Sequence, residues 1–184
     1  MKKIMLVLLL MLSSLATIGC SANETLAAFI TKFTASTNHQ MVLSMYSPEQ
    51  GFVSLTYQID GNKTFTGNST DPSSDVFTLN YNGIMYLYTQ DEDTSSWVRE
   101  VSTDELDSVF NIASGMVATD FRETGTNEFT LKSNFLNDYE MDSFVIEITD
   151  EGAIFTITAD GIQMTITISE FDNISITLPS IAAE

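Results

Sequence analysis

The chain is poor in cysteine, histidine, proline and basic residues. It contains one cysteine, one histidine and three prolines, and it has seven Lys or Arg residues against 25 Asp or Glu. A single thiol excludes an intramolecular disulfide, so a hydrophobic core must hold the fold together. The formal net charge of −18 argues against nucleic-acid binding, because such binding needs a basic surface.

The sequence also lacks the residue patterns on which most enzymes depend. His39 is the sole histidine, and it is expected to be a structural residue beside the start of a strand rather than a general base. We find no Gly-x-Ser-x-Gly motif and no glycine-rich phosphate loop. Two acidic groups, at residues 91–93 and 138–142, do not have the spacing of a calcium loop. We therefore expect no enzyme activity, no cofactor and no metal site.

No apolar run is long enough to cross a bilayer, which needs about 20 residues. The longest run, Ile4 to Leu12, follows Met1-Lys2-Lys3 and precedes mostly small residues that end at Gly19 and Cys20. This order of regions is typical of a secretory signal. It resembles a bacterial lipoprotein signal peptide, whose last small residue precedes the cysteine that receives the lipid. The resemblance implies removal of residues 1–19 and lipidation of Cys20.

Lipidation of Cys20 would tether the mature chain to a membrane. Loss of Lys2 and Lys3 lowers the number of basic residues from 7 to 5, and the net charge changes from −18 to −20. Such a chain has no attraction to an anionic bilayer, so the acyl chains of a diacylglyceryl cysteine must hold it. We expect the extracytoplasmic face of the cell membrane, or the outer membrane and periplasm of a two-membrane envelope. Ordinary secretion with cleavage after Ala22 is the alternative.

Hydrophobic periodicity indicates an α+β fold within residues 25–180, after a short tether at residues 20–24. Apolar residues at helical spacing predict a helix from about Thr25 to Phe33 and a second from about Thr103 to Ala118. A capping box, Ser102 with Glu105, supports the start of the second helix. About ten strands with period-two alternation and short connections predict a large antiparallel sheet. They lie near residues 39–46, 52–59, 64–67, 76–81, 84–89, 97–101, 128–132, 143–149, 153–158, 162–169 and 174–178.

Several pieces of this order carry a family resemblance. They are Tyr57 to Lys63, Tyr81 to Tyr88, Trp97, and Phe171 to Pro179 with its Ile-Thr-Leu-Pro ending. The chain resembles the half-barrel lipoproteins related to the lipoprotein carrier LolA and to the mycobacterial lipid-binding lipoproteins. The resemblance implies one domain in which a curved antiparallel sheet has two or so helices on its concave face. It also implies an apolar cavity between them that accepts acyl chains.

Aromatic and methionine residues are the candidates for lining such a cavity, although each of them would also fit an ordinary close-packed core. The expected function is a membrane-anchored monomer that binds or carries a lipid or another hydrophobic ligand. The alternative is a closed-core accessory protein of the envelope, which takes no small ligand and meets a protein partner. The candidate lining residues are Phe29, Phe33, Met41, Met45, Met85, Trp97, Phe110 and Met116.

Overall fold

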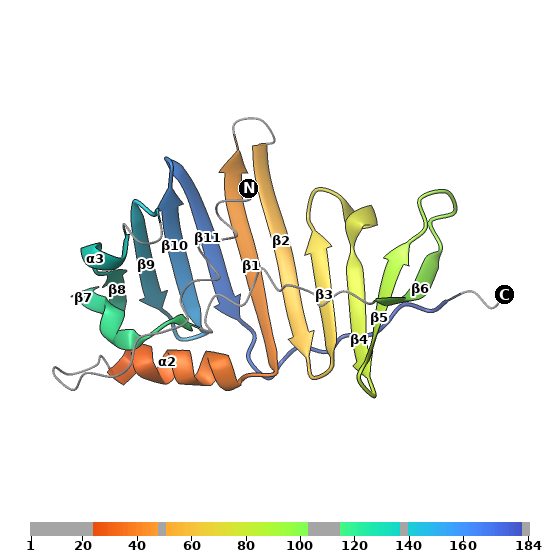
Figure 1. Ribbon diagram of the computed structural model, residues 1–184, viewed down its shortest axis with the longest axis horizontal. Coiled ribbons are helices and arrows are strands. Elements are labelled where there is room, and N and C mark those ends of the chain that lie inside the picture. The colour runs from red at the N-terminus through yellow and green to blue at the C-terminus, as the bar shows by residue number, and fades with distance from the viewer. Residues whose placement is uncertain (1–23, 48–50, 103–114, 137–139, 182–184) are drawn as a thin grey trace. The chain divides into compact units, whose positions relative to one another are not determined.

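The strands form one antiparallel sheet of eleven strands, with one pair of neighbours that are not consecutive in the chain, β1 and β11. The computed structural model describes residues 24–47, 51–102, 115–136 and 140–181. Across the sheet the order is β6-β5-β4-β3-β2-β1-β11-β10-β9-β8-β7, so β6 and β7 form its two edges (Figure 1). This confirms the prediction of a large antiparallel sheet with a small helical component.

The bounds of the elements follow the predicted periodicity closely. Within the described residues the helices are α2 (Glu24–Ala35) and α3 (Ser133–Leu136), with 3₁₀ turns η1 (Pro72–Ser74) and η3 (Ala118–Asp120). The strands are β1 (Asn38–Ser47), β2 (Gly51–Asp60), β3 (Lys63–Asn68), β4 (Val76–Tyr81), β5 (Ile84–Gln90), β6 (Trp97–Ser102), β7 (Phe121–Gly125), β8 (Glu128–Leu131), β9 (Ser143–Ile148), β10 (Ala153–Ala159) and β11 (Ile162–Ser169).

Two-residue turns set the register of two hairpins. Asn82 and Gly83 join β4 to β5 with φ values of 53° and 77°, and Asp160 and Gly161 join β10 to β11 with 52° and 73°. Positive φ at both positions defines a turn whose twist matches that of the flanking strands. Glycine occupies the second position at no steric cost, which is why these dipeptides were readable as hairpins.

The chain divides into two compact units. The first contains α2, η3, β7 to β10 and most of β11. The second contains β1 to β6 and the C-terminal residues from Ile168. Each unit has buried hydrophobic residues of its own.

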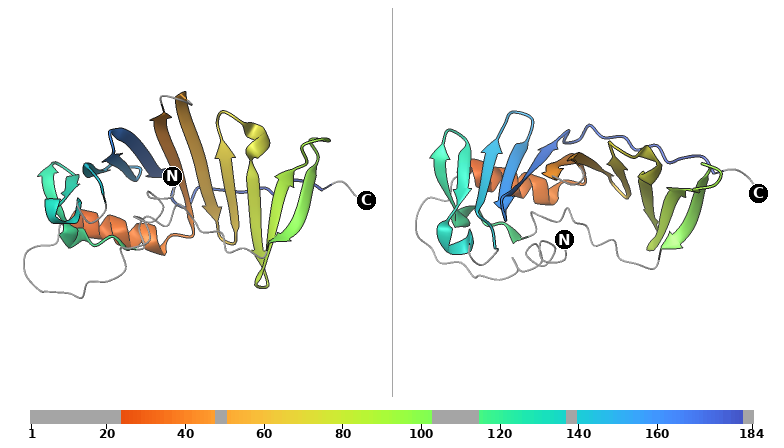
Figure 2. Two further views of the ribbon diagram at one scale, coloured as in Figure 1. Left: turned by 45° about the horizontal axis from the view of Figure 1, so that its top comes forward. Right: turned by 90° about the horizontal axis from the view of Figure 1, so that it is seen from above.

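Aromatic side chains from α2 and the strands build the core of the first unit. Phe29 of α2 stacks on Phe33 with ring centroids 5.8 Å apart and meets Phe155 of β10 edge to face at 6.1 Å. Phe155 in turn meets Phe144 of β9 at 5.7 Å. Figure 2 shows α2 lying over one face of these strands. Alternate residues of β9 and β10 therefore face the helix and are buried.

The C-terminal residues 171–181, here called the strap, contain no strand, so the predicted strand at 174–178 is wrong. The alternation of Ile174, Ile176 and Leu178 does produce an extended chain. At Ile174 and Ile176, side chains rather than a neighbouring strand satisfy the backbone. In Figure 1 the strap leaves β11 and runs past β1, β2 and β3 towards β6.

Three side chains at the ends of β1, β2 and β3 hold the strap. The Asn38 amide donates to the Ile174 carbonyl and accepts from the Ile174 N–H, both at 2.8 Å. Asp60 accepts from the Ile176 N–H at 3.0 Å, and Lys63 donates to the Ile176 carbonyl at 2.9 Å. Ile174 and Ile176 are thus each bonded on both backbone groups, as they would be in a ladder. The Ile176 N–H, helped by Lys63, lowers the pKa of the Asp60 carboxyl.

Other parts of the secondary structure differ from the sequence prediction. Strand β7 was not predicted, because Arg122 and Glu123 interrupt its apolar alternation at the edge of the sheet. The one-turn helix α3 was also missed. The predicted second helix lies mostly outside the described residues. Its described end, residues 115–118, contains no α-helix.

Candidate functional site

The registers of β1 to β5 place a set of uncharged residues on one face of the second unit. Residues directly opposite each other in antiparallel strands share a face, and alternate residues follow them. Met41 lies opposite Tyr57, Tyr57 opposite Thr66, Thr64 opposite Thr78 and Thr78 opposite Leu87. We call this the neutral face. It comprises His39, Met41, Leu43, Met45, Val53, Leu55, Tyr57, Ile59, Thr64, Thr66, Asn68, Val76, Thr78, Asn80, Met85, Leu87 and Thr89.

Along these five strands the neutral face carries no Asp, Glu, Lys or Arg, although the chain has 25 acids. A solvated face of so acidic a protein is expected to carry charge. The first charged residue on this side of the unit is Glu100 of β6, opposite Leu87. The absence of charge therefore distinguishes these strands from an ordinary exposed surface.

Burial is uneven across the neutral face, and Thr78 of β4 is buried, with 6% exposure. Met41 and Leu43 are 1% and 8% exposed. The apolar side chains of β2 on this face, such as Leu55, are only half-buried, as are Met85 and Leu87 of β5. Half-buried aliphatic side chains on neighbouring strands leave apolar area that a ligand would remove from water.

Threonine hydroxyls form a polar stripe between the aliphatic residues of β2 and β5. The hydroxyl oxygens of Thr64 and Thr78 lie 2.6 Å apart across β3 and β4. Thr66 is the next residue of β3 on this face, and it is half-buried. Tyr57, opposite Thr66, has its pKa raised by burial of the phenol. These groups offer hydrogen bonds without charge.

The opposite face of β3 to β6 is aromatic and carries charge. Phe77 of β4 lies between Phe65, at 4.8 Å between ring centroids, and Trp97, at 5.3 Å. The Arg99 guanidinium lies over the Tyr86 ring, 5.2 Å from its centroid. Phe65, Phe77 and Trp97 pack on one another, so these three rings form a small core of their own.

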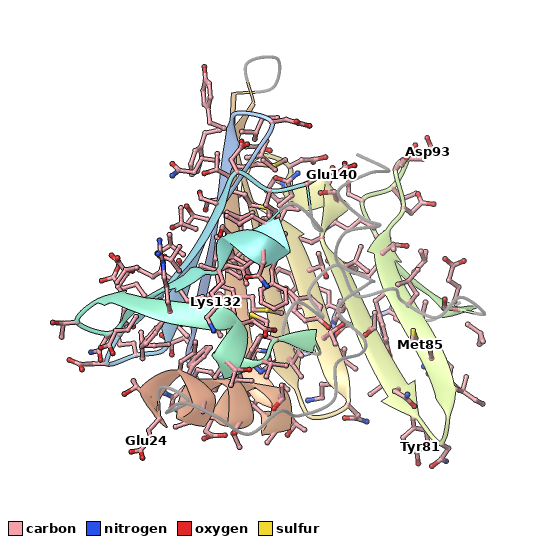
Figure 3. All side chains as sticks on the ribbon, turned by 60° about the vertical axis from the view of Figure 1, so that its left-hand side comes forward. Glu24, Tyr81, Met85, Asp93, Lys132 and Glu140 are labelled. Atoms are coloured by element: carbon pink, nitrogen blue, oxygen red, sulfur yellow. The ribbon has the colours of Figure 1, made fainter. Side chains whose placement is uncertain are left out.

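The structure brings together only some of the predicted lining residues. Met41, Met45 and Met85 share the neutral face; Met85 is labelled in Figure 3, near Tyr81 of the β4–β5 turn. Trp97 belongs to β6 and lies on the opposite side of the sheet.

The other predicted residues lie elsewhere. Phe29, Phe33 and Met116 are buried in the first unit, with 5 to 7% exposure. Phe110 and the proposed lipid-bearing Cys20 lie outside the described residues.

Several residues of the neutral face were not singled out from the sequence. Leu55, Leu87 and the threonines of β3 and β4 lacked the size or chemistry that marks a candidate. The strand register could have identified these residues. The Asn82-Gly83 turn sets the register of β4 against β5, and the alternation of side chains then assigns each residue to a face.

Groups that could support other chemistry are already engaged within the protein. His39 is 4% exposed and packs against Phe171, with ring centroids 5.8 Å apart, and its burial lowers the pKa of the imidazole. The Asp91 carboxylate accepts bonds from the hydroxyl and N–H of Thr94, at 2.8 Å each, and these bonds lower its pKa.

In residues 24–47, 51–102, 115–136 and 140–181 no group of three His, Cys, Asp or Glu could hold a metal ion. Nor is any helix of these residues long and apolar enough to span a membrane.

A scan of the sequence against protein-family models found no match, and a search of curated proteins found no relative.

Proposed function

We propose that the protein is a membrane-anchored lipoprotein, outside the cytoplasm, that binds a lipid or similar hydrophobic ligand against the neutral face. One observation carries this proposal: the neutral face runs across β1 to β5 without a single charged side chain, and it carries half-buried aliphatic residues on β2, β4 and β5. Burial of a charge without a partner is costly, so a face that receives acyl chains must be free of charge.

Burial of acyl chains supplies enough free energy for such binding. Each methylene removed from water contributes about 0.8 kcal/mol, so half of a long acyl chain matches the free energy of a micromolar complex, about 8 kcal/mol. Methionine side chains adapt to different apolar shapes. Met41, Met45 and Met85 on the neutral face are consistent with a ligand of variable chain structure.

The proposed anchor is tested separately from the ligand. The Cys20→Ser variant cannot be lipidated, so we expect its release from the membrane fraction. Retention of the variant in the membrane would overturn the anchor and leave the ligand proposal unaffected.

Native mass spectrometry tests the ligand. The mature chain, residues 20–184 with Cys20→Ser, is purified from a bacterial host without detergent and then extracted with organic solvent. We expect a bound mass that extracts as a lipid. A mass of the protein alone, unchanged after incubation with phospholipids and acylglycerols, would favour the closed-core accessory protein.

A matched pair of variants ties the bound mass to the neutral face. Leu55 and Thr56 are neighbours in β2, both half-buried, and they point to opposite faces. We expect Leu55→Gln to lose the bound lipid and Thr56→Gln to keep it. Equal retention by both variants would place the ligand elsewhere.

A further inference from the structure

We infer that the ligand is a neutral lipid, with a hydroxyl or ester head group, rather than a fatty acid anion or a phospholipid. The inference rests on the proposed function and adds the chemical class of the ligand. It comes from the placement of the basic residues and from the threonine stripe.

All basic residues after Lys3 lie in the described part of the chain, so their positions are known. In the second unit they are Lys63 and Arg99, and both lie on the face opposite the neutral face. Each is also engaged: Lys63 bonds to the Ile176 carbonyl and pairs with Asp60, and Arg99 lies over Tyr86. The remaining three, Lys32, Arg122 and Lys132, lie in the first unit.

An anionic head group on the neutral face would therefore have no basic side chain of these strands to pair with. A carboxylate or phosphate that leaves water needs such a partner or several strong hydrogen-bond donors. The net charge of the mature chain, −20 after loss of Lys2 and Lys3 from a chain of −18, adds repulsion over longer distances. Both effects act against anionic lipids and leave an uncharged lipid unaffected.

The threonine stripe suits an uncharged head group. A hydroxyl offers one donor and two acceptor positions, so the Thr64–Thr78 pair, 2.6 Å apart, uses one of its two donors internally. One donor and several acceptor positions are then left for a ligand or water. Thr66 adds a third hydroxyl on the same face. The aliphatic residues on either side, Leu55 and Leu87, would contact the chain.

The experiment compares lipids that share one chain and differ in the head group. Oleyl alcohol, monooleoylglycerol and oleate each displace a fluorescent uncharged probe from the mature Cys20→Ser chain, at a pH of about 8 where oleate is ionised. We expect both neutral lipids to bind about tenfold or more tightly than oleate. Equal or tighter binding of oleate would overturn the inference but keep the proposed function. Absence of binding by all three would overturn both.

A pair of lysine substitutions adds a gain-of-function measurement. Thr66→Lys places a cation on the neutral face, and Thr56→Lys places the same cation on the opposite face. We expect Thr66→Lys to lower the ratio of the affinities for neutral lipid and for oleate by about tenfold, because the lysine pairs with the carboxylate. This change would remove or reverse the preference for neutral lipids. We expect Thr56→Lys to leave the ratio unchanged. An equal effect of both would show that net charge alone sets the preference, which contradicts the inference. Circular dichroism confirms that each variant is folded.

Discussion

The strap provides the most direct test of how the second unit is held together. The Asn38→Ala variant removes two hydrogen bonds of 2.8 Å to the Ile174 backbone and a longer one, of 3.3 Å, to Asp60. A typical intramolecular hydrogen bond contributes about 0.5–1.5 kcal/mol net. The two shorter bonds together therefore predict a loss of about 2 kcal/mol in the free energy of unfolding.

Urea unfolding and hydrogen exchange measure this effect globally and locally. We expect the variant to unfold at lower urea concentration, and amides of residues 172–178 to lose protection before those of β1 and β2. Asn134→Ala is the control, because Asn134 is exposed on the short helix α3. A loss below about 0.5 kcal/mol, with unchanged exchange in the strap, would refute the idea that side chains replace a strand partner here.

Substitutions at three further positions probe other parts of the fold. Burial lowers the pKa of His39, so the unfolded chain gains a proton before the folded one. Stability should then fall as the pH drops below 6.5, and urea unfolding of His39→Gln should lack this component. Phe155→Ala should cost about 3–5 kcal/mol, because the side chain is 0% exposed and contacts Phe29; Phe155→Leu, which keeps more volume, should cost clearly less, and equal losses would contradict the packing argument. Gly67→Ala should cost about 1–3 kcal/mol in a thermal melt, because its Cβ would lie 2.5 Å from the Phe65 ring; no loss would mean that the ring moves freely.

The strands could be predicted because two local signals agreed along most of the chain. In β10, Ala153, Phe155 and Ile157 are buried and alternate with half-buried residues. The Asp160-Gly161 turn then leads directly into β11. Alternation sets the faces and the turn sets the register, and both depend on neighbouring residues only.

The strap is a segment whose secondary structure could not be predicted from its local sequence pattern. Ile174 and Ile176 alternate with polar residues as in a strand, and the backbone is extended. Whether an extended segment pairs with a strand depends on what lies beside it. Here the neighbours are the side chains of Asn38 and Asp60, which lie 136 and 116 residues away in the sequence from the strap residues that they bind. No local pattern reports such a partner.

The candidate site was also predictable from the sequence only in part. The acidic composition, the single cysteine after a short apolar run and the order of strands were determined by the sequence by itself. The choice of face was decided only in the tertiary structure: Met85 and Trp97 are similar as apolar candidates, yet the pairing of β5 with β6 places them on opposite sides of the sheet. Successive side chains along a strand point to opposite faces of the sheet. The face of a given residue is therefore known only when the pairing register of its strand with the neighbouring strands is known. The same registration separates Lys63 and Arg99 from the neutral face, and the inference about the ligand's charge depends on that separation.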